Sequence, residues 1–338
     1  MPSKSPDHLP WRIKLFVSTL SYAVDFTRRS DGSINRRLMS WFDPRTSPSP
    51  SKPINGGKSM DITVDKTRNI WFRLYNPTTT TTTTADDNDM PVIFYFHGGG
   101  FSYFAPSSKP FDDFCYNLAR ELQAVIISVN YRLAPEYRYP CQYEDCLDAM
   151  KFIDDTKLEE IPSEANLRQC FLAGDSAGGN LAHHVAVRAS EYEFSNIKLI
   201  GFMAIQPYFG GEERTESEIK LEGAPFITTK RTDLVWRTFL PEGSNRDHQA
   251  SNVFGPNAVD ISRLDRFPPT IVFVGGFDPL QDWQKSYYEG LKKSGKEAFL
   301  IEYPNAIHSF YAFPELPEFS LFMKEVKGFM QNRIHGAN

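Results

Sequence analysis

The sequence FLAGDSAGGN, residues 171–180, places one serine among three glycines, between an apolar segment and a helix-like segment. Its central five residues, Gly-Asp-Ser-Ala-Gly, match the pattern G-x-S-x-G. A turn that lifts a serine clear of a sheet leaves no room for side chains two positions away, which explains the glycines at 174 and 178. We interpret Ser176 as a candidate nucleophile. A glycine-rich turn between a strand and a helix, without chemistry, is the alternative.

Short apolar segments without strict alternation recur from residue 91 onward, as expected for strands that are buried on both faces of a parallel sheet. They are residues 92–96, 124–129, 170–174, 199–205, 270–276 and 298–303. Amphipathic segments lie between them at 111–122, 143–154 and 281–293. Strand-like residues 60–64 and 70–75 come before this alternation. The pattern predicts an α/β fold in which helices flank a mostly parallel central sheet.

Residues 207–269 interrupt this alternation, because they contain no convincing strand and only one helix-like segment, at 233–240. We interpret them as a cap insertion over the carboxyl edge of the sheet, where open α/β sheets bind ligands. The low-complexity residues 76–89, with seven threonines, are expected to form a surface hairpin loop.

Residues 1–58 are predicted to form an N-terminal lid helix and a polar, proline-rich connector, which leaves the α/β domain at 59–338. Five apolar residues of the helix share one face: Ile13, Phe16, Val17, Leu20 and Val24. A signal peptide is the alternative, but serine and threonine interrupt the apolar segment and no small-x-small cleavage site follows it.

The composition points to a protein without nucleic acid or membrane partners. The chain has 338 residues and a net charge of −5, and no basic cluster occurs. No apolar segment approaches the ~18 residues of a membrane span. The four cysteines lack metal-ligand spacing and are expected to be reduced in a cytoplasmic, or alternatively nuclear, protein. No metal, cofactor or obligate protein partner is implied.

The second motif, FYFHGGGF at 94–101, also ends a strand-like segment. Its glycines, Gly98, Gly99 and Gly100, leave backbone N–H groups bare, as an oxyanion hole requires, and the N–H of Ala177 would complete the hole. A phosphate-binding turn is the alternative, but the sequence contains neither G-x-G-x-x-G nor G-x-x-x-x-G-K-[ST].

An acid and a histidine follow later strand-like segments, in the chain order Ser, Asp, His that such a fold requires. Asp278 comes just after residues 270–276, and His308 lies in the loop after the last segment. Asp282 is the alternative acid, although it could instead cap the next helix. His308 could also be an ordinary loop histidine, and His97 is interpreted as structural.

Together these residues predict ester hydrolysis through an acyl-enzyme, in which His308 takes the proton of Ser176 and Asp278 orients the imidazole. Six apolar residues are expected to wall the substrate pocket, although each is equally compatible with ordinary core packing: Phe101, Tyr208, Phe209, Trp236, Leu240 and Ile307. Three residues of the lid are expected above it: Trp11, Phe16 and Leu20.

Five motifs occur along the chain in a fixed order: HGGGF (97–101), NYRLAPE (130–136), GDSAGGN (174–180), GGFDPLQD (275–282) and IHSF (307–310). In these motifs the chain resembles the plant carboxylesterases of the hormone-sensitive-lipase branch of the α/β-hydrolases. The resemblance implies a serine carboxylesterase for short- to medium-chain, small-molecule esters. It implies the triad Ser176, Asp278 and His308 and an oxyanion turn at 98–100.

The segment FTRRSDGSINRRLMSWFD, residues 26–43, resembles the lid region of the gibberellin receptors, which belong to the same family. Those receptors lack the catalytic histidine and end the oxyanion turn with serine, whereas this chain has His308 and Gly100. The differences favour an enzyme over a hormone-binding protein, and a cyclase or lyase is a further alternative. The resemblance also implies that Arg132 and Glu136 brace the turn after the strand-like segment 124–129.

Overall fold

The computed structural model describes residues 6, 9–78, 89–224 and 226–336, and it contains a sheet of eight strands. The strands are β1 (Gly57–Asp65), β2 (Ile70–Pro77), β3 (Met90–Phe96), β4 (Val125–Asn130), β5 (Ala165–Asp175), β6 (Leu199–Ile205), β7 (Thr270–Phe277) and β8 (Ala298–Ile307). Their order is β1-β2-β4-β3-β5-β6-β7-β8. β1 and β2 are antiparallel to their neighbours and the other strands run parallel, which confirms the predicted α/β fold.

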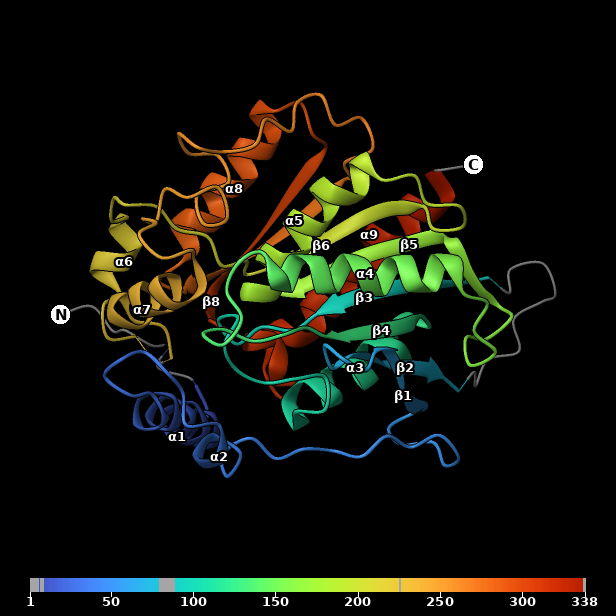
Figure 1. The fold of residues 1–338 in the computed structure, drawn as a ribbon, viewed down its shortest axis with the longest axis horizontal. Helices are drawn as coiled ribbons and strands as arrows, with labels where there is room; N and C mark the ends of the chain where they lie inside the picture. The colour runs from blue at the N-terminus through green and yellow to red at the C-terminus, as the bar shows by residue number, and fades with distance from the viewer. Residues whose placement is uncertain (1–5, 7–8, 79–88, 225, 337–338) are drawn as a thin grey trace.

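Helices cover both faces of this sheet (Figure 1). They are α1 (Trp11–Thr27), α2 (Arg36–Met39), α3 (Lys109–Leu122), α4 (Cys141–Asp155), α5 (Ala177–Glu191), α6 (Glu216–Lys220), α7 (Thr229–Phe239), α8 (Gln281–Lys293), the 3-10 helix η1 (Phe310–Ala312) and α9 (Pro317–Gly336). α4, α5 and α8 pack into the apolar core on one face, and α3 and α9 pack into the core on the other.

The central strand β3 shows why the strand-like segments of the sequence lack alternation. Val92 and Phe94 belong to the core on one side of the sheet, and Ile93 and Tyr95 belong to the core on the other side. All four side chains are fully buried. A strand with helices on both faces needs apolar side chains at consecutive positions, so the two layers of helices follow from this sequence pattern.

The last strand, β8, is longer than the sequence indicated. It continues through Pro304 to Ile307, so His308 follows the strand directly instead of lying five residues beyond it. β8 is an edge strand, where a proline without an N–H donor is tolerated. The proline therefore gave these residues the character of a loop in the sequence.

Residues 207–269 contain α6 and α7 and, apart from residue 225, which the structure does not describe, no strand. α7 begins four residues before the predicted helix because the side chain of Thr228 caps its N-terminus by accepting from the N–H of Arg231. The predicted threonine-rich loop falls largely on residues 79–88, outside the described residues. None of the helices in the described ranges is long and apolar enough to cross a membrane.

Three buried histidines make stability depend on pH. Burial lowers the pKa of His97 and of His183 to about 3 and places the pKa of His184 well below 6.5. Below pH 6.5 the unfolded chain binds protons that the folded protein excludes, so this stability is present above pH 6.5 and is lost as the pH falls. We expect the free energy of unfolding in urea to drop by about 0.7 kcal/mol per histidine, about 2 kcal/mol together, between pH 7 and pH 6.

The variant His183→Gln is the control for this pH dependence. Glutamine does not titrate, and its amide can still hydrogen-bond Tyr287, whose hydroxyl lies 3.0 Å from Nδ1 of His183. The variant should therefore lose about a third of the pH dependence. A difference between pH 7 and pH 6 that is as large in the variant as in the parent protein would contradict the assignment.

Candidate active site

Ser176 lies at the point where β5 ends and α5 begins, in a strained conformation with φ 52° and ψ −119°. The two flanking glycines permit this turn. A Cβ atom at position 174 would lie 2.1 Å from the carbonyl oxygen of Gly178, and one at position 178 would lie 1.8 Å from that of Phe96. The turn is thus closed by backbone contacts that no other residue type allows at these two positions.

The three side chains expected to act together lie in hydrogen-bond contact. Nε2 of His308 is 3.0 Å from Oγ of Ser176, and Nδ1 of His308 is 2.7 Å from Oδ2 of Asp278. All three residues are buried. Asp282, the alternative acid, instead accepts a hydrogen bond of 2.7 Å from the backbone N–H of Ser217 and so connects α8 to α6.

Two glutamines surround Asp278, and sequence reasoning missed both of them. Nε2 of Gln206 donates to Oδ2 of Asp278 at 3.1 Å and to the carbonyl of Ile307 at 3.2 Å, while its Oε1 accepts from the N–H of Ser309 at 2.8 Å. Nε2 of Gln284 also donates to Oδ2 of Asp278, at 2.8 Å. Gln206 therefore holds both the acid and the backbone on either side of the histidine. The one sequence signal for Gln206 was its position directly after the apolar segment 199–205.

The glycine turn after β3 presents two backbone donors beside Ser176. Gly99 and Gly100 have positive φ angles of 108° and 59°, and both line the cavity that Ser176 lines. Within the described part of the chain, their N–H groups have no hydrogen-bond acceptor. Ala177 is the first residue of α5, where a helix has no internal partner for its N–H.

Gly98 differs from the expectation, because its N–H donates to Oδ1 of Asp175 at 2.9 Å and is not free to receive an oxyanion. Asp175 also accepts from the hydroxyls of Tyr95 and Tyr311. Burial raises the pKa of this carboxyl group, and the three donors counteract that effect. Asp175 thus fastens the glycine turn to the serine turn, a role that the sequence pattern did not reveal.

His97 at the start of the glycine turn is buried and stacks on Tyr131, with ring centroids 4.4 Å apart. Its Nδ1 lies 2.8 Å from the carbonyl oxygen of Gly98. It is not among the residues that line the cavity. These contacts are those of a residue that supports the turn.

A cavity of about 730 Å³ opens next to Ser176 and His308. Of the six predicted wall residues only Tyr208 lines it; the other five are Phe101, Phe209, Trp236, Leu240 and Ile307, and all of them are buried in the cores. Phe101, for example, stacks on Phe239 at 3.8 Å. The direction in which a residue points after a strand end depends on the backbone of the loop, which the sequence pattern does not give.

The N-terminal helix α1 forms one wall of the cavity. Phe16 and Leu20 line it as expected, whereas Trp11 does not and is 68% exposed. α1 is joined to α7 through Arg231, which donates to the carboxylate of Asp25 at 2.9 and 2.6 Å. This hydrogen bond lowers the pKa of Asp25.

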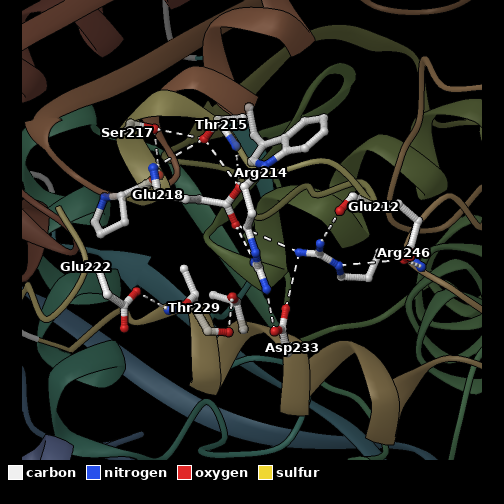
Figure 2. A network of polar contacts seen from close by, with 12 residues as sticks. Glu212, Arg214, Thr215, Ser217, Glu218, Glu222, Thr229, Asp233 and Arg246 are labelled. Carbon is white, nitrogen blue, oxygen red and sulfur yellow. Dashed lines mark hydrogen bonds and ion pairs between the residues drawn. The ribbon is translucent and has the colours of Figure 1, made fainter. Parts of the chain in front are cut away.

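The opposite side of α7 is fixed by a network of charges within the cap segment (Figure 2). Asp233 accepts from Arg214 and pairs with Arg246 at 3.2 Å. Arg214 also donates to the buried Glu218 at 2.9 Å. With α7 held on this side, Leu234 and Val235 line the cavity.

Arg132 and Glu136, expected to brace the same turn, have separate partners. Arg132 pairs with the buried Asp145, at 2.8 Å. Glu136 pairs with Arg36 of the N-terminal segment, and Arg36 also donates to the carbonyls of Ser102 and Ala134. Glu136 therefore anchors the segment that follows α1. Among the side chains the structure describes, no group of three or more His, Cys, Asp or Glu could hold a metal ion.

Comparison with known proteins gives a consistent set of relatives. A model of the alpha/beta hydrolase fold family matches residues 93–312. A gibberellin receptor of Arabidopsis thaliana is 39% identical over 330 residues, which are 95% of this chain and 94% of the receptor. A carboxylesterase of the same plant is 37% identical over 279 residues, 81% of this chain and 85% of the esterase. A solved esterase structure from Pyrobaculum calidifontis, 26% identical, has a TM-score of 0.69 and covers 96% of this chain and 94% of its own.

Proposed function

The chain belongs to the alpha/beta hydrolase fold family, within the group that includes plant carboxylesterases and gibberellin receptors, and on this premise we propose that it is a serine carboxylesterase. The observation that carries the proposal is the continuous hydrogen-bonded row of Ser176, His308 and Asp278. These hydrogen-bonded residues lie at a cavity that Gly99 and Gly100 also line, and among the described residues nothing accepts from the N–H groups of these two glycines.

The proposed reaction begins when His308 removes the proton of Ser176 at Nε2, while Asp278 holds the other ring nitrogen and stabilises the imidazolium. Ser176 attacks the ester carbonyl, and the oxyanion is received by the N–H groups of Gly99, Gly100 and Ala177. His308 then protonates the leaving alcohol, and water hydrolyses the acyl-enzyme by the same route. One oxyanion donor of this kind contributes about 2.7–4 kcal/mol of transition-state stabilisation.

In this proposal the substrates are small esters with short or medium acyl chains, and the enzyme is cytoplasmic. Residues 1–58 act as lid and connector, and residues 207–269 act as a cap. The contribution of α1 and α7 to the cavity supports both assignments. Residues 59–338 then form the catalytic domain.

Purified protein should hydrolyse p-nitrophenyl acetate and butyrate, and a fluorophosphonate should label it covalently with one label per chain. An excess of the ester should slow the labelling for as long as the ester is present, because both compounds compete for the same serine. Hydrolysis no faster than in buffer, together with no labelling, would remove the proposal.

Gln206→Leu tests whether Gln206 positions the acid and the histidine. The substitution removes the tethers to Asp278 and to Ser309, so the imidazole is no longer held in one orientation. We expect kcat for p-nitrophenyl butyrate to fall by about 10- to 100-fold, with KM changed by less than about threefold, because a small misplacement of a catalytic group costs rate more than binding. The rate of fluorophosphonate labelling should fall in parallel.

Gln284→Leu is the matched control, since Gln284 also donates to Asp278 but has no contact with the backbone around His308. Its effect on kcat should be smaller than that of Gln206→Leu. Equal losses in the two variants, or a change confined to KM in Gln206→Leu, would show that Gln206 has no positioning role beyond one bond to the acid.

One observation favours a second candidate, a hormone-binding protein similar to the gibberellin receptors. α1 forms a wall of the cavity, and sequence identity to such a receptor extends over 95% of this chain. Calorimetry with an active gibberellin would show micromolar or tighter binding that survives His308→Ala. No heat would exclude this hormone as the ligand.

A further inference from the structure

The cavity next to Ser176 has a basic lining, although the whole chain carries a net charge of −5. The cationic residues that line it are Arg28, Arg29, Lys230, Arg231 and Arg237. The acidic residues that line it are Asp25, Asp175 and Glu222. Much of the remaining lining is apolar, from aromatic and aliphatic side chains of α1, α3 and α7. Such a lining favours a hydrophobic ligand that also carries negative charge.

Several charges near the cavity are already satisfied by protein groups, whereas Lys230 and Arg237 are exposed to solvent. Arg231 is paired with Asp25, and Asp175 accepts from two tyrosines and one backbone N–H. On the outer side of α7, Arg214 and Arg246 are paired with acids of the cap (Figure 2). These groups are part of the scaffold and are not available to a ligand.

Arg28 is different. Its Nε donates to the hydroxyl of Tyr103 at 3.2 Å, and its guanidinium lies over the ring of that tyrosine, 5.4 Å from the centroid. Its Nη1 is buried and lacks a hydrogen-bond partner, and no residue in the described ranges accepts from its Nη2. The side chain is thus held from one edge, while the edge formed by Nη1 and Nη2 has no protein acceptor. Arg28 as a whole is half-buried, but leaving a buried charged donor such as its Nη1 without an acceptor is costly, so the site favours a ligand that supplies one.

We propose that Arg28 is an anion subsite of this cavity and that it selects esters bearing a carboxylate remote from the scissile bond. A carboxylate at the free edge of a guanidinium accepts charge-assisted hydrogen bonds, which are stronger than those that a neutral group of the same length accepts. Tyr103 fixes the guanidinium plane before the ligand arrives, which lowers the entropy that binding must overcome. The preference for a carboxylate during turnover rests on the proposed esterase function, whereas binding at the subsite does not.

The test compares p-nitrophenyl monoesters of dicarboxylic acids from adipic to sebacic acid with the same compounds capped as methyl esters. A parallel pair, 4-acetoxybenzoate and its methyl ester, places the carboxylate on the alcohol side. The length series is needed because the carboxylate must reach Arg28 while the ester carbonyl lies at Ser176. We expect kcat/KM to favour the free acid by at least about tenfold at the best length or in the parallel pair. A ratio near one throughout would overturn the proposal.

Arg28→Met should reduce this ratio to about one, and Arg28→Lys should retain part of it, because lysine keeps the charge without the planar fork. Both kcat/KM values of a ratio are measured on one protein preparation, so a smaller folded fraction lowers both equally and leaves the ratio unchanged. Arg29→Met is the matched control: Arg29 is the exposed neighbour, and its one side-chain hydrogen bond among the described residues runs from Nη1 to Ser33. Its ratio should stay at the parent value. If Arg28→Met and Arg29→Met lowered the ratio equally, the preference for the acid would come from the overall positive charge of the cavity and not from a subsite at Arg28.

Binding to the Ser176→Ala variant separates the subsite from catalysis. In calorimetry, monomethyl adipate and the longer monomethyl esters should bind at least about tenfold more tightly than the corresponding dimethyl esters, and Arg28→Met should abolish the difference. This preference without any ester turnover would support the subsite and contradict the esterase. Turnover of neutral esters with no preference for the acid, in binding or in rate, would support the esterase and contradict the subsite.

Discussion

Replacing Ser176 with alanine is expected to lower kcat/KM for p-nitrophenyl butyrate by at least about 10⁴-fold, since a serine enzyme without its nucleophile retains only the contribution of the oxyanion donors and of binding. The one side-chain hydrogen bond that Ser176 makes in the described structure is with His308. Its removal therefore leaves the turn, which backbone contacts close, in place. Fluorophosphonate labelling should disappear, while the melting temperature stays within about 2 °C of the parent value.

The variant His308→Ala and the double variant Ser176→Ala with His308→Ala show whether the residues act as one unit. Because the histidine has no proton to take once the serine is gone, the double variant should be no slower than either single variant. Additive losses would mean that His308 acts on some other group. Activity in Ser176→Ala comparable to that of the parent would show that a different residue carries the reaction.

The parts of this site that the sequence indicated share one physical basis. Gly174 and Gly178 have no alternative at a turn whose backbone closes on itself, so their spacing indicated Ser176 as the candidate nucleophile. Strands buried on both faces required consecutive apolar residues, and this placed Asp278 and His308 at the carboxyl edge of the sheet. Each of these inferences depends on backbone geometry that every chain of this fold must adopt.

The parts that the sequence did not indicate depend on side-chain direction. Phe101 follows a strand end as Tyr208 does, and Ile307 is the last residue of β8, yet of these three only Tyr208 faces the cavity. Gly98 belongs to the same run of glycines as its neighbours, but its N–H is used by Asp175. Gln206 supports the acid through a left-handed backbone position, φ 42°, that no local pattern predicts. Such details are fixed by tertiary contacts between segments far apart in the chain.

Gly178→Ala is expected to destabilise the folded protein severely. The added Cβ would lie 1.8 Å from the carbonyl oxygen and 2.6 Å from the carbonyl carbon of Phe96, and 2.9 Å from the carbonyl carbon of His97. All three atoms are backbone at the end of β3, so no side-chain rotation relieves the overlap. α5 and β3 must separate, and the serine turn then moves away from the glycine turn. We expect the free energy of unfolding to fall by more than about 4 kcal/mol.

Gly328→Ala, the same chemical change, isolates the contribution of this close contact. Gly328 lies in the middle of α9, and apart from its chain neighbours and the backbone of its own helix no heavy atom of the described residues lies within 4 Å of a Cβ built there. Alanine at this position should raise the free energy of unfolding by about 0.5–1 kcal/mol, because it lowers the flexibility of the unfolded chain and suits a helix. Urea denaturation should therefore show that the free energy of unfolding falls in Gly178→Ala and rises in Gly328→Ala. If Gly178→Ala unfolded at the same urea concentration as Gly328→Ala, the serine turn would not depend on the approach of α5 to β3, and neither would the geometry that brings Ser176 to Gly99 and Gly100.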